Sequence, residues 1–422
     1  MSSGLEIHPV KDVRRQRIAI SGIFLMVGIM LGSWFARVPQ LRIELGLNFA
    51  ELGMVLLAQT VGVLLAMQLA GHLSNHLDSR AVIRVTSLVL PWFLPLMAAM
   101  PGAITAGLGM LTWGIIAGLL DVSMNAQGVE VERRVRRPVL NSLHAVWGIG
   151  ALLGSGGTVL AVRAEWSLSS HFWVVSVVLV AIALFSGRWL LTEARSGAVA
   201  ERAPKVGFFS GWTRAVIVLG GLGAAVALCE GAVSSWGGVF LSEQRGAAAN
   251  LASLGYFAFI VAQTGTRLIG DRLHRRFGAV ALVRWSMAMT AAGVLLAVMV
   301  QSVWFGLAGL AMTGVGLAVA IPIISSAVGH GTKSNTSLAI ARYSTLHNAG
   351  VLAGPAIFGW LAQTFGISTA LTLLLVPLGI IGLFASATAP ASVASGASST
   401  SDPSDPSDSS GSSPEPVVPR AA

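Results

Sequence analysis

Residues 17–38 read RIAISGIFLMVGIMLGSWFARV, and this stretch decides the class of fold. It is apolar between Arg17 and Arg37 apart from glycine and serine. A helix needs about 20 such residues to cross the hydrocarbon core of a bilayer. The basic segment 11–17 before it resembles the start of a signal peptide, but the apolar run is too long for one and no cleavage site is evident. We therefore expect a first transmembrane helix that is retained.

The composition of the whole chain also indicates a membrane protein. Of the 422 residues, 54% are hydrophobic and 11% are charged, whereas soluble domains carry about 25% charged residues. The net charge of +9 comes from residues scattered between apolar runs. Such scatter forms no continuous basic patch and argues against a nucleic-acid partner. The one cysteine, Cys229, allows no internal disulfide.

Apolar segments of spanning length recur along the chain. They cover residues 17–38, 50–73, 82–100, 103–127, 139–162, 171–192, 213–240, 250–268, 279–300, 303–327, 337–362 and 368–388. Several contain proline, which membrane helices tolerate where neighbours satisfy the freed backbone groups. The sequence predicts an all-α membrane protein with about twelve transmembrane helices in two six-helix halves.

Lysine and arginine are unevenly distributed between the predicted loops. Of the 27 basic residues, only Arg37, Arg42, Arg163 and Arg245 fall on one side of the membrane. Basic loops stay in the cytoplasm. We expect a multi-pass protein of the inner (plasma) membrane with both termini cytoplasmic.

The spacing of these segments predicts five regions. The C-terminal one is rich in Ser, Pro and Asp, cannot bury a core and is expected to be disordered. The regions are a cytoplasmic tail (1–16), a six-helix bundle (17–192), a cytoplasmic loop (193–212), a second six-helix bundle (213–388) and the disordered tail (389–422).

The two predicted bundles repeat each other. Matching residues recur in the same order, with Ser33-Trp34 and Ser235-Trp236, Gln59 and Gln263, Gly114 and Gly314, His144 and His347, Gly150 and Gly350. Repeated halves are a recurring transporter plan, in which the substrate site lies at the repeat interface near the middle of the membrane.

The loop after the second predicted helix reads GHLSNHLDSR at residues 71–80, and the loop after the eighth reads RLIGDRLHRRFG at residues 267–278. Both resemble the loop signature of the major facilitator superfamily. The first copy departs from it, with Asn75 where an Asp is usual. The resemblance extends over about residues 15–390 and implies that both loops help to hold a gate. The residues concerned are Gly71, Asp78 and Arg80 in the first loop and Gly270, Asp271 and Arg272 in the second.

A more specific resemblance lies in the fourth helix. Residues 121–133 read DVSMNAQGVEVER, and residues 141–145 and 230–232 read NSLHA and EGA. Together they resemble the MosC-like (rhizopine-transporter-like) branch of the superfamily. This resemblance implies a transport role and leaves the substrate open.

Asp121 lies in the middle of the fourth predicted helix. A charge at bilayer depth costs about 2.5–3.5 kcal/mol on insertion scales, so it normally faces the bundle interior and has a function. It belongs to a stripe of small and polar residues on one helix face: Gly114, Gly118, Asp121, Asn125 and Gly128. We expect Asp121 and Asn125 to bind substrate or protons; the alternative is a structural hydrogen-bond hub.

Glu230 is the corresponding acidic residue in the seventh predicted helix, with Ser234 one turn further on the same face. Desolvation favours the protonated form of a carboxyl, as a proton carrier requires. The alternative is a neutral acid with a structural role.

His144 and His347 are approximate symmetry mates in the fifth and eleventh helices. Histidine can change charge near neutral pH, although each could equally be a neutral residue bonded between helices. The neighbouring Trp147 and Asn348 could supply a stacking face and a hydrogen bond.

These features predict a secondary transporter of a small, polar organic solute that works by alternating access with proton coupling. We expect it to be monomeric, with lipid and the solute as its partners and with no cofactor or metal. The segments 150–157 and 350–355 resemble a signature of drug/proton antiporters, so export of a hydrophobic compound is an alternative. A non-transporting receptor on the same fold is another. No phosphate-binding loop or catalytic cluster points to an enzyme.

Overall fold

The computed structural model describes residues 10–73, 78–135, 137, 139–191, 211–331 and 336–389, and α-helices make up nearly all of this part. Most of the predicted loop 193–212, the tail after residue 389 and Asn75 lie outside the described residues. The described residues form one compact unit.

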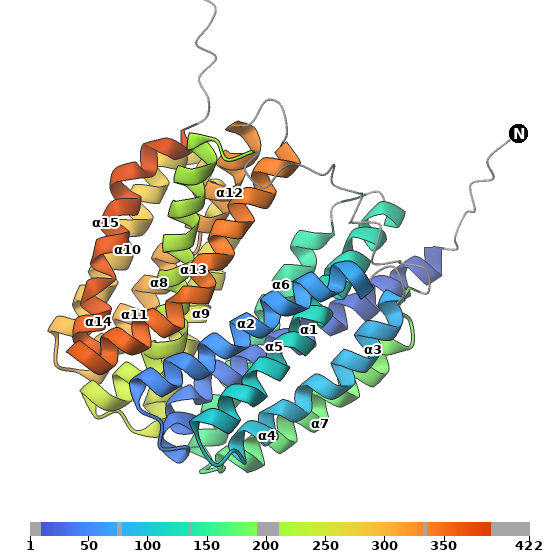
Figure 1. Ribbon diagram of the computed structural model, residues 1–422, viewed down its shortest axis with the longest axis horizontal. Helices are drawn as coiled ribbons and strands as arrows, with labels where there is room; N and C mark the ends of the chain where they lie inside the picture. The colour runs from blue at the N-terminus through green and yellow to red at the C-terminus, as the bar shows by residue number, and fades with distance from the viewer. Residues whose placement is uncertain are drawn as a thin grey trace, which may run out of the picture. The chain divides into compact units, whose positions relative to one another are not determined.

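Among its described residues, the first half of the chain has seven α-helices, which Figure 1 draws from blue to green. They are α1 (Val10–Glu44), α2 (Phe49–Leu73), α3 (Ser79–Val89), α4 (Phe93–Ala98), α5 (Ala103–Val135), α6 (Leu140–Arg163) and α7 (Leu168–Gly187), with the 3-10 helix η1 (Leu90–Trp92) between α3 and α4.

The described part of the second half has eight α-helices. They are α8 (Arg214–Arg245), α9 (Ala249–Phe277), α10 (Ala279–Met299), α11 (Val303–Leu317), α12 (Ala320–Gly331), α13 (Thr336–Phe365), α14 (Ile367–Leu373) and α15 (Leu375–Leu383), followed by the 3-10 helix η3 (Phe384–Thr388).

These helices supply the predicted membrane crossings. Ten spans in the described part of the chain are long and apolar enough to cross a bilayer. Three of them consist of two shorter helices in series: α3–α4, α11–α12 and α14–α15. The other two crossings are α9 and α13, which have 29 and 30 residues and carry more polar side chains.

Several helices are longer than their apolar segments. α1 covers Val10–Glu44, where 17–38 was expected, and α9 covers Ala249–Phe277, where 250–268 was expected. Hydropathy marks only the part of a helix that contacts hydrocarbon, whereas the hydrogen-bonded backbone can continue into the headgroup region and beyond. Basic residues in the last turn, such as Arg275 and Arg276 of α9, favour such an extension through the helix dipole.

The internal repeat recurs as matching close contacts between helix backbones. A Cβ on Gly114 of α5 would meet the carbonyl oxygen of Gln59 in α2, and one on Gly314 of α11 would meet that of Phe259 in α9. The second pair of glycines behaves in the same way. A Cβ on Gly150 of α6 would meet the carbonyl oxygen of Leu25 in α1, and one on Gly350 of α13 would meet that of Ala224 in α8.

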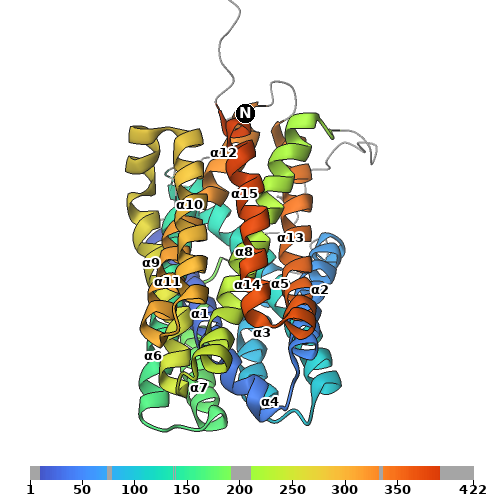
Figure 2. The ribbon, with the colours of Figure 1, turned by 90° about the vertical axis from the view of Figure 1, so that its left-hand side faces the viewer.

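The paired helices are therefore α1 with α6 and α2 with α5 in the first half, and α8 with α13 and α9 with α11 in the second. Small residues allow such close approach, which matters in lipid because no hydrophobic effect drives helices together there. The contacts between the halves run mainly through α2 with α13 and α6 with α9. α2 and α13 meet near the turn between α1 and α2 and diverge away from it (Figures 1 and 2).

We predict that Gly114→Leu reduces the folded fraction of the protein. Leucine would force α5 away from α2, and overpacking of this kind costs about 1–3 kcal/mol or more. Gly107→Leu on the same helix is the matched control, because nothing lies within 4 Å of a Cβ built there. Size-exclusion profiles and thermal melts in detergent compare the two variants, and equal stability would contradict the close-packing role of Gly114.

Candidate functional site

The two halves are joined at one end of the bundle, next to the turn of residues 45–48. Arg42 Nη2 lies 2.6 Å from Glu243 Oε1 of the second half. The backbone N–H of Phe49 donates a hydrogen bond of 3.0 Å to Oε1 of Gln363 in α13. We call this the closed end.

Further contacts between the halves extend inward from the closed end. The rings of Phe35 in α1 and Tyr256 in α9 lie 5.1 Å apart. Gly53 of α2 and Gly359 of α13 approach each other so closely that a side chain on either would contact the other helix. The site described next lies further along the helices from these contacts.

Glu230 of α8 is the centre of a group of polar side chains. Its Oε1 accepts a hydrogen bond of 2.9 Å from Nε2 of Gln263 and lies 3.5 Å from Nη2 of Arg267. Gln263 and Arg267 are four residues apart on α9, so they share one face of that helix. Nε of Arg267 also donates to the carbonyl oxygen of Ala318, at the break between α11 and α12.

The second carboxyl oxygen of Glu230 differs from the first. Oε2 is buried and has no hydrogen-bond partner within the described part of the chain. A buried polar atom without a partner is costly and requires an explanation. Because Oε1 already holds both partners, Oε2 is the free position at which a proton could bind.

Asp121 lies on α5 in the first half. Nδ2 of Asn125 donates to the Asp121 backbone oxygen at 2.9 Å and to its Oδ1 at 3.1 Å. Although Asp121 lies near the middle of its helix, its side chain is exposed. An exposed carboxyl at that depth is expected to face the interior of the bundle or a water-filled space rather than lipid.

His144 of α6 interacts electrostatically with charged residues of both halves. Its side chain is exposed, and its ring contacts Phe24 edge-on at 5.3 Å. It lies within electrostatic range of Asp121 in its own half and of Arg267 in the other half. We refer to Asp121, Asn125, His144, Glu230, Gln263 and Arg267 as the polar cluster.

Two of the remaining predicted residues, Ser234 and His347, have local partners. Ser234 donates to the backbone oxygen of Glu230 at 2.7 Å, and not to its carboxyl group. Nδ1 of His347 donates to the carbonyl oxygen of Gly223 at 3.3 Å, and its ring stacks on that of Tyr343. Trp147 and Asn348 are half-buried on α6 and α13. Across the described residues, no hydrogen bond connects these four predicted residues to the Glu230 carboxyl.

The predicted gating residues contact their own halves. Asp78 caps α3 by accepting a hydrogen bond from the backbone N–H of Arg80. The guanidinium Nη2 of Arg80 donates to the carbonyl oxygen of Arg188 after α7. Gly71 lies in the last turn of α2.

In the second copy, Gly270 packs against Val319 at the break between α11 and α12, while Asp271 and Arg272 are exposed. Their proposed role in a gate stays a prediction.

Sequence reasoning missed Gln263 and Arg267 as site residues. Arg267 was expected to begin the loop motif of residues 267–278, but it lies within α9. The spacing of Gln263 and Arg267 on one helix face was the available signal.

Comparisons with known proteins agree with this architecture. Residues 219–419 match the Major Facilitator Superfamily. The chain is 31% identical over 370 residues to an uncharacterised MFS-type transporter of Yersinia pestis, covering 88% of this chain and 95% of that one. It is 29% identical over 387 residues to the membrane protein MosC of Rhizobium meliloti, covering 91% and 92%.

Two solved structures share the fold at low sequence identity. The nucleoside transporter NupG superposes with a TM-score of 0.72 at 12% identity, over 88% of this chain and 98% of that one. The fucose:proton symporter FucP of E. coli superposes with a TM-score of 0.58 at 16% identity, over 88% and 98%.

The curated relatives match nearly the whole length of the chain, and the solved structures match its arrangement of helices. The resemblance predicted from the loops and from the fourth helix is thereby confirmed. Relatives and structural neighbours alike are named as membrane proteins or transporters rather than enzymes. The chain belongs to the Major Facilitator Superfamily of membrane transporters.

Proposed function

We propose that the protein is a secondary active transporter that moves a small, polar organic solute by alternating access, coupled to protons. Glu230 carries this proposal, because one of its oxygens is held by Gln263 and Arg267 while the other is buried without a partner among the described residues. A carboxyl at membrane depth with one free oxygen can take up a proton and release it again.

The polar cluster supports a polar solute. It contains carboxyl, amide, imidazole and guanidinium groups drawn from both halves. Such groups offer several directed hydrogen bonds, which hydroxyl-bearing or nitrogen-bearing solutes can use. Two proteins of the same fold are named for nucleoside and fucose:proton transport, which is consistent with this solute class.

Proton binding would change the partners of Arg267. A neutral Glu230 attracts the guanidinium less strongly, so protonation would free Arg267 to interact with the solute or with Asp121 across the halves. His144 lies within electrostatic range of both Asp121 and Arg267, so it would respond to this change. The proton on one half would thus alter the attraction between the halves.

The contacts between the halves support alternating access. The closed end joins them through Arg42 with Glu243 and Phe49 with Gln363, and α2 and α13 diverge away from it (Figure 1). With the basic loops in the cytoplasm, the closed end faces outward. We propose that this is the inward-facing state of a plasma-membrane protein whose two termini are cytoplasmic.

Two alternative functions, a non-transporting receptor and an exporter of hydrophobic compounds, would need a different set of residues in place of the polar cluster. A receptor that does not transport has no use for an unpaired carboxyl oxygen between two moving halves. An exporter of hydrophobic compounds needs an apolar binding surface rather than a charged one. The charged residues of the polar cluster favour the polar-solute transporter over both.

We predict that Glu243→Gln opens the closed end more often. A partly buried ion pair contributes about 1 kcal/mol, so its loss changes the ratio of closed to open forms by up to about fivefold. Spin labels on Ile43→Cys and Ala249→Cys report the distance across the closed end by double electron–electron resonance. The native Cys229 should not take up the label, because it is buried. Glu44→Gln is the control, because the Glu44 carboxylate accepts from Gln40 of its own helix. Identical distance distributions in all three proteins would show that the ion pair does not hold this end.

We predict that Asp121→Asn and Glu230→Gln abolish proton-coupled transport while the protein stays folded. Proteoliposomes containing a pH-sensitive dye, screened with sugars, polyols, nucleosides and amines, measure proton movement with each solute. At least one solute should drive proton flux in the wild type, and each variant should reduce that flux tenfold or more, equivalent to about 1.4 kcal/mol.

Glu130→Gln is the matched control for this experiment. Glu130 lies on the same helix as Asp121 but pairs with Arg134 at 3.0 Å. The Glu130→Gln variant should therefore transport normally. Unchanged pH-dependent transport in both Asp121→Asn and Glu230→Gln would refute proton coupling at these carboxyls.

A further inference from the structure

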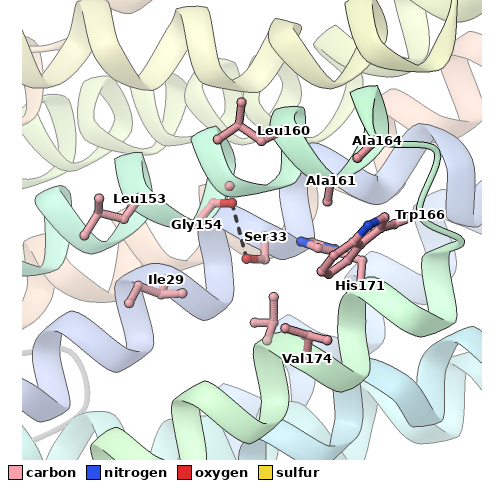
Figure 3. A pocket seen from close by; sticks show the side chains of 12 residues that line it. Ile29, Ser33, Leu153, Gly154, Leu160, Ala161, Ala164, Trp166, His171 and Val174 are labelled. Carbon is pink, nitrogen blue, oxygen red and sulfur yellow. Dashed lines mark hydrogen bonds between the residues drawn. The ribbon is translucent and has the colours of Figure 1, made fainter.

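A groove of about 380 Å³ lies between α1, α6 and α7, outside the polar cluster (Figure 3). Small residues of α6 form its floor, namely Gly154, Gly157 and Ala161. A Cβ built on Gly157 would have nothing within 4 Å, so the floor is open at that point.

The walls of the groove are apolar and exposed. Leu153, Leu160 and Val174 are 57%, 66% and 46% exposed. On a membrane-spanning bundle, exposed apolar side chains contact hydrocarbon. The groove therefore opens sideways into the bilayer rather than into the space between the halves.

One polar side chain on the groove lacks a partner. His171 of α7 is only 3% exposed, and its Nδ1 has no hydrogen-bond partner among the described residues. Ser33, opposite it in Figure 3, donates its hydroxyl to the carbonyl oxygen of Gly154 and is already satisfied. A buried imidazole nitrogen without a partner is costly, which points to an absent ligand atom.

The rim of the groove lies at the closed end. Nη2 of the buried Arg37 donates to the carbonyl oxygen of Trp166, in the turn between α6 and α7, and fixes that turn in place. The Trp166 side chain is 43% exposed, and tryptophan is enriched where hydrocarbon meets the headgroups. His171 follows five residues later and lies just inside this boundary.

The length of the groove matches one lipid leaflet. Its lining runs along α6 from Leu153 to Ala164, the residue that caps this helix, which is about 16 Å at ~1.5 Å per residue. Half of a hydrocarbon core of about 30 Å is about 15 Å. The groove thus extends from the headgroup boundary to near the middle of the membrane.

We propose that this groove binds one acyl chain of a phospholipid from the leaflet at the closed end, with the ester carbonyl accepting a hydrogen bond from Nδ1–H of His171. The ester group lies at the edge of the hydrocarbon core, at the level of His171. The chain then fills the strip above Gly157 and Ala161. This site depends only on the protein spanning a membrane and is independent of the transported solute.

The test uses the full-length protein in nanodiscs with a phospholipid that carries a diazirine in its acyl chain. After illumination, mass spectrometry locates the cross-linked peptides. We expect labelling concentrated within residues 153–175 in the wild type. Gly157→Leu fills the groove and should remove this labelling. His171→Phe keeps a ring but loses a hydrogen bond worth ~1 kcal/mol, and should reduce the labelling about fivefold.

Gly379→Leu is the matched control, since Gly379 is exposed on α15 and nothing lies within 4 Å of a Cβ there. It should leave labelling of residues 153–175 unchanged. If Gly157→Leu does not fold, His171→Phe still tests the proposal. Labelling spread evenly over the exposed helices, or equal in the wild type and His171→Phe, would overturn the proposal.

Discussion

Hydrocarbon solvates neither backbone polar groups nor charges, and the structure depends on this constraint. Backbone groups in the membrane are satisfied within helices, so the described chain is helical almost throughout. Because lipid is as apolar as leucine, burial of apolar side chains cannot hold these helices together. Close backbone contact at Gly114, Gly150, Gly314 and Gly350 does so instead. The repeat in the sequence is thus a repeat of the contacts that assemble each half.

The same constraint determines where charges lie. Arg42 and Glu243 pair across the closed end, and Glu230 pairs with Arg267 deeper in the protein. A charge that cannot be solvated by lipid must find a partner or a proton. In the proposed alternating-access cycle the two halves move relative to each other, and such partners can be exchanged. The proposed mechanism couples proton binding, solute binding and the approach of the halves through one small group of side chains.

The sequence predicts the fold well because the signals for it are repeated many times. Each apolar segment, each loop charge and each glycine pair contributes independently. Asp121 and Glu230 were also predictable, since a charge within an apolar segment is conspicuous. Gln263 and Arg267 were not, because only the packing of α9 against α8 shows that they contact the Glu230 carboxyl. The groove beside His171 was not predictable either. Its shape, and the lack of a partner for His171, depend on how α1, α6 and α7 pack.

The proposed proton site makes Glu230 a group that is protonated and deprotonated inside the membrane. Infrared difference spectroscopy of the protein in lipid, between acidic and alkaline buffer, observes this directly through the carbonyl stretch of protonated carboxylic acids. The spectrum should contain such a band that exchanges with deuterium and disappears in Glu230→Gln. An identical spectrum in the wild type and in Glu230→Gln would contradict proton binding at this residue.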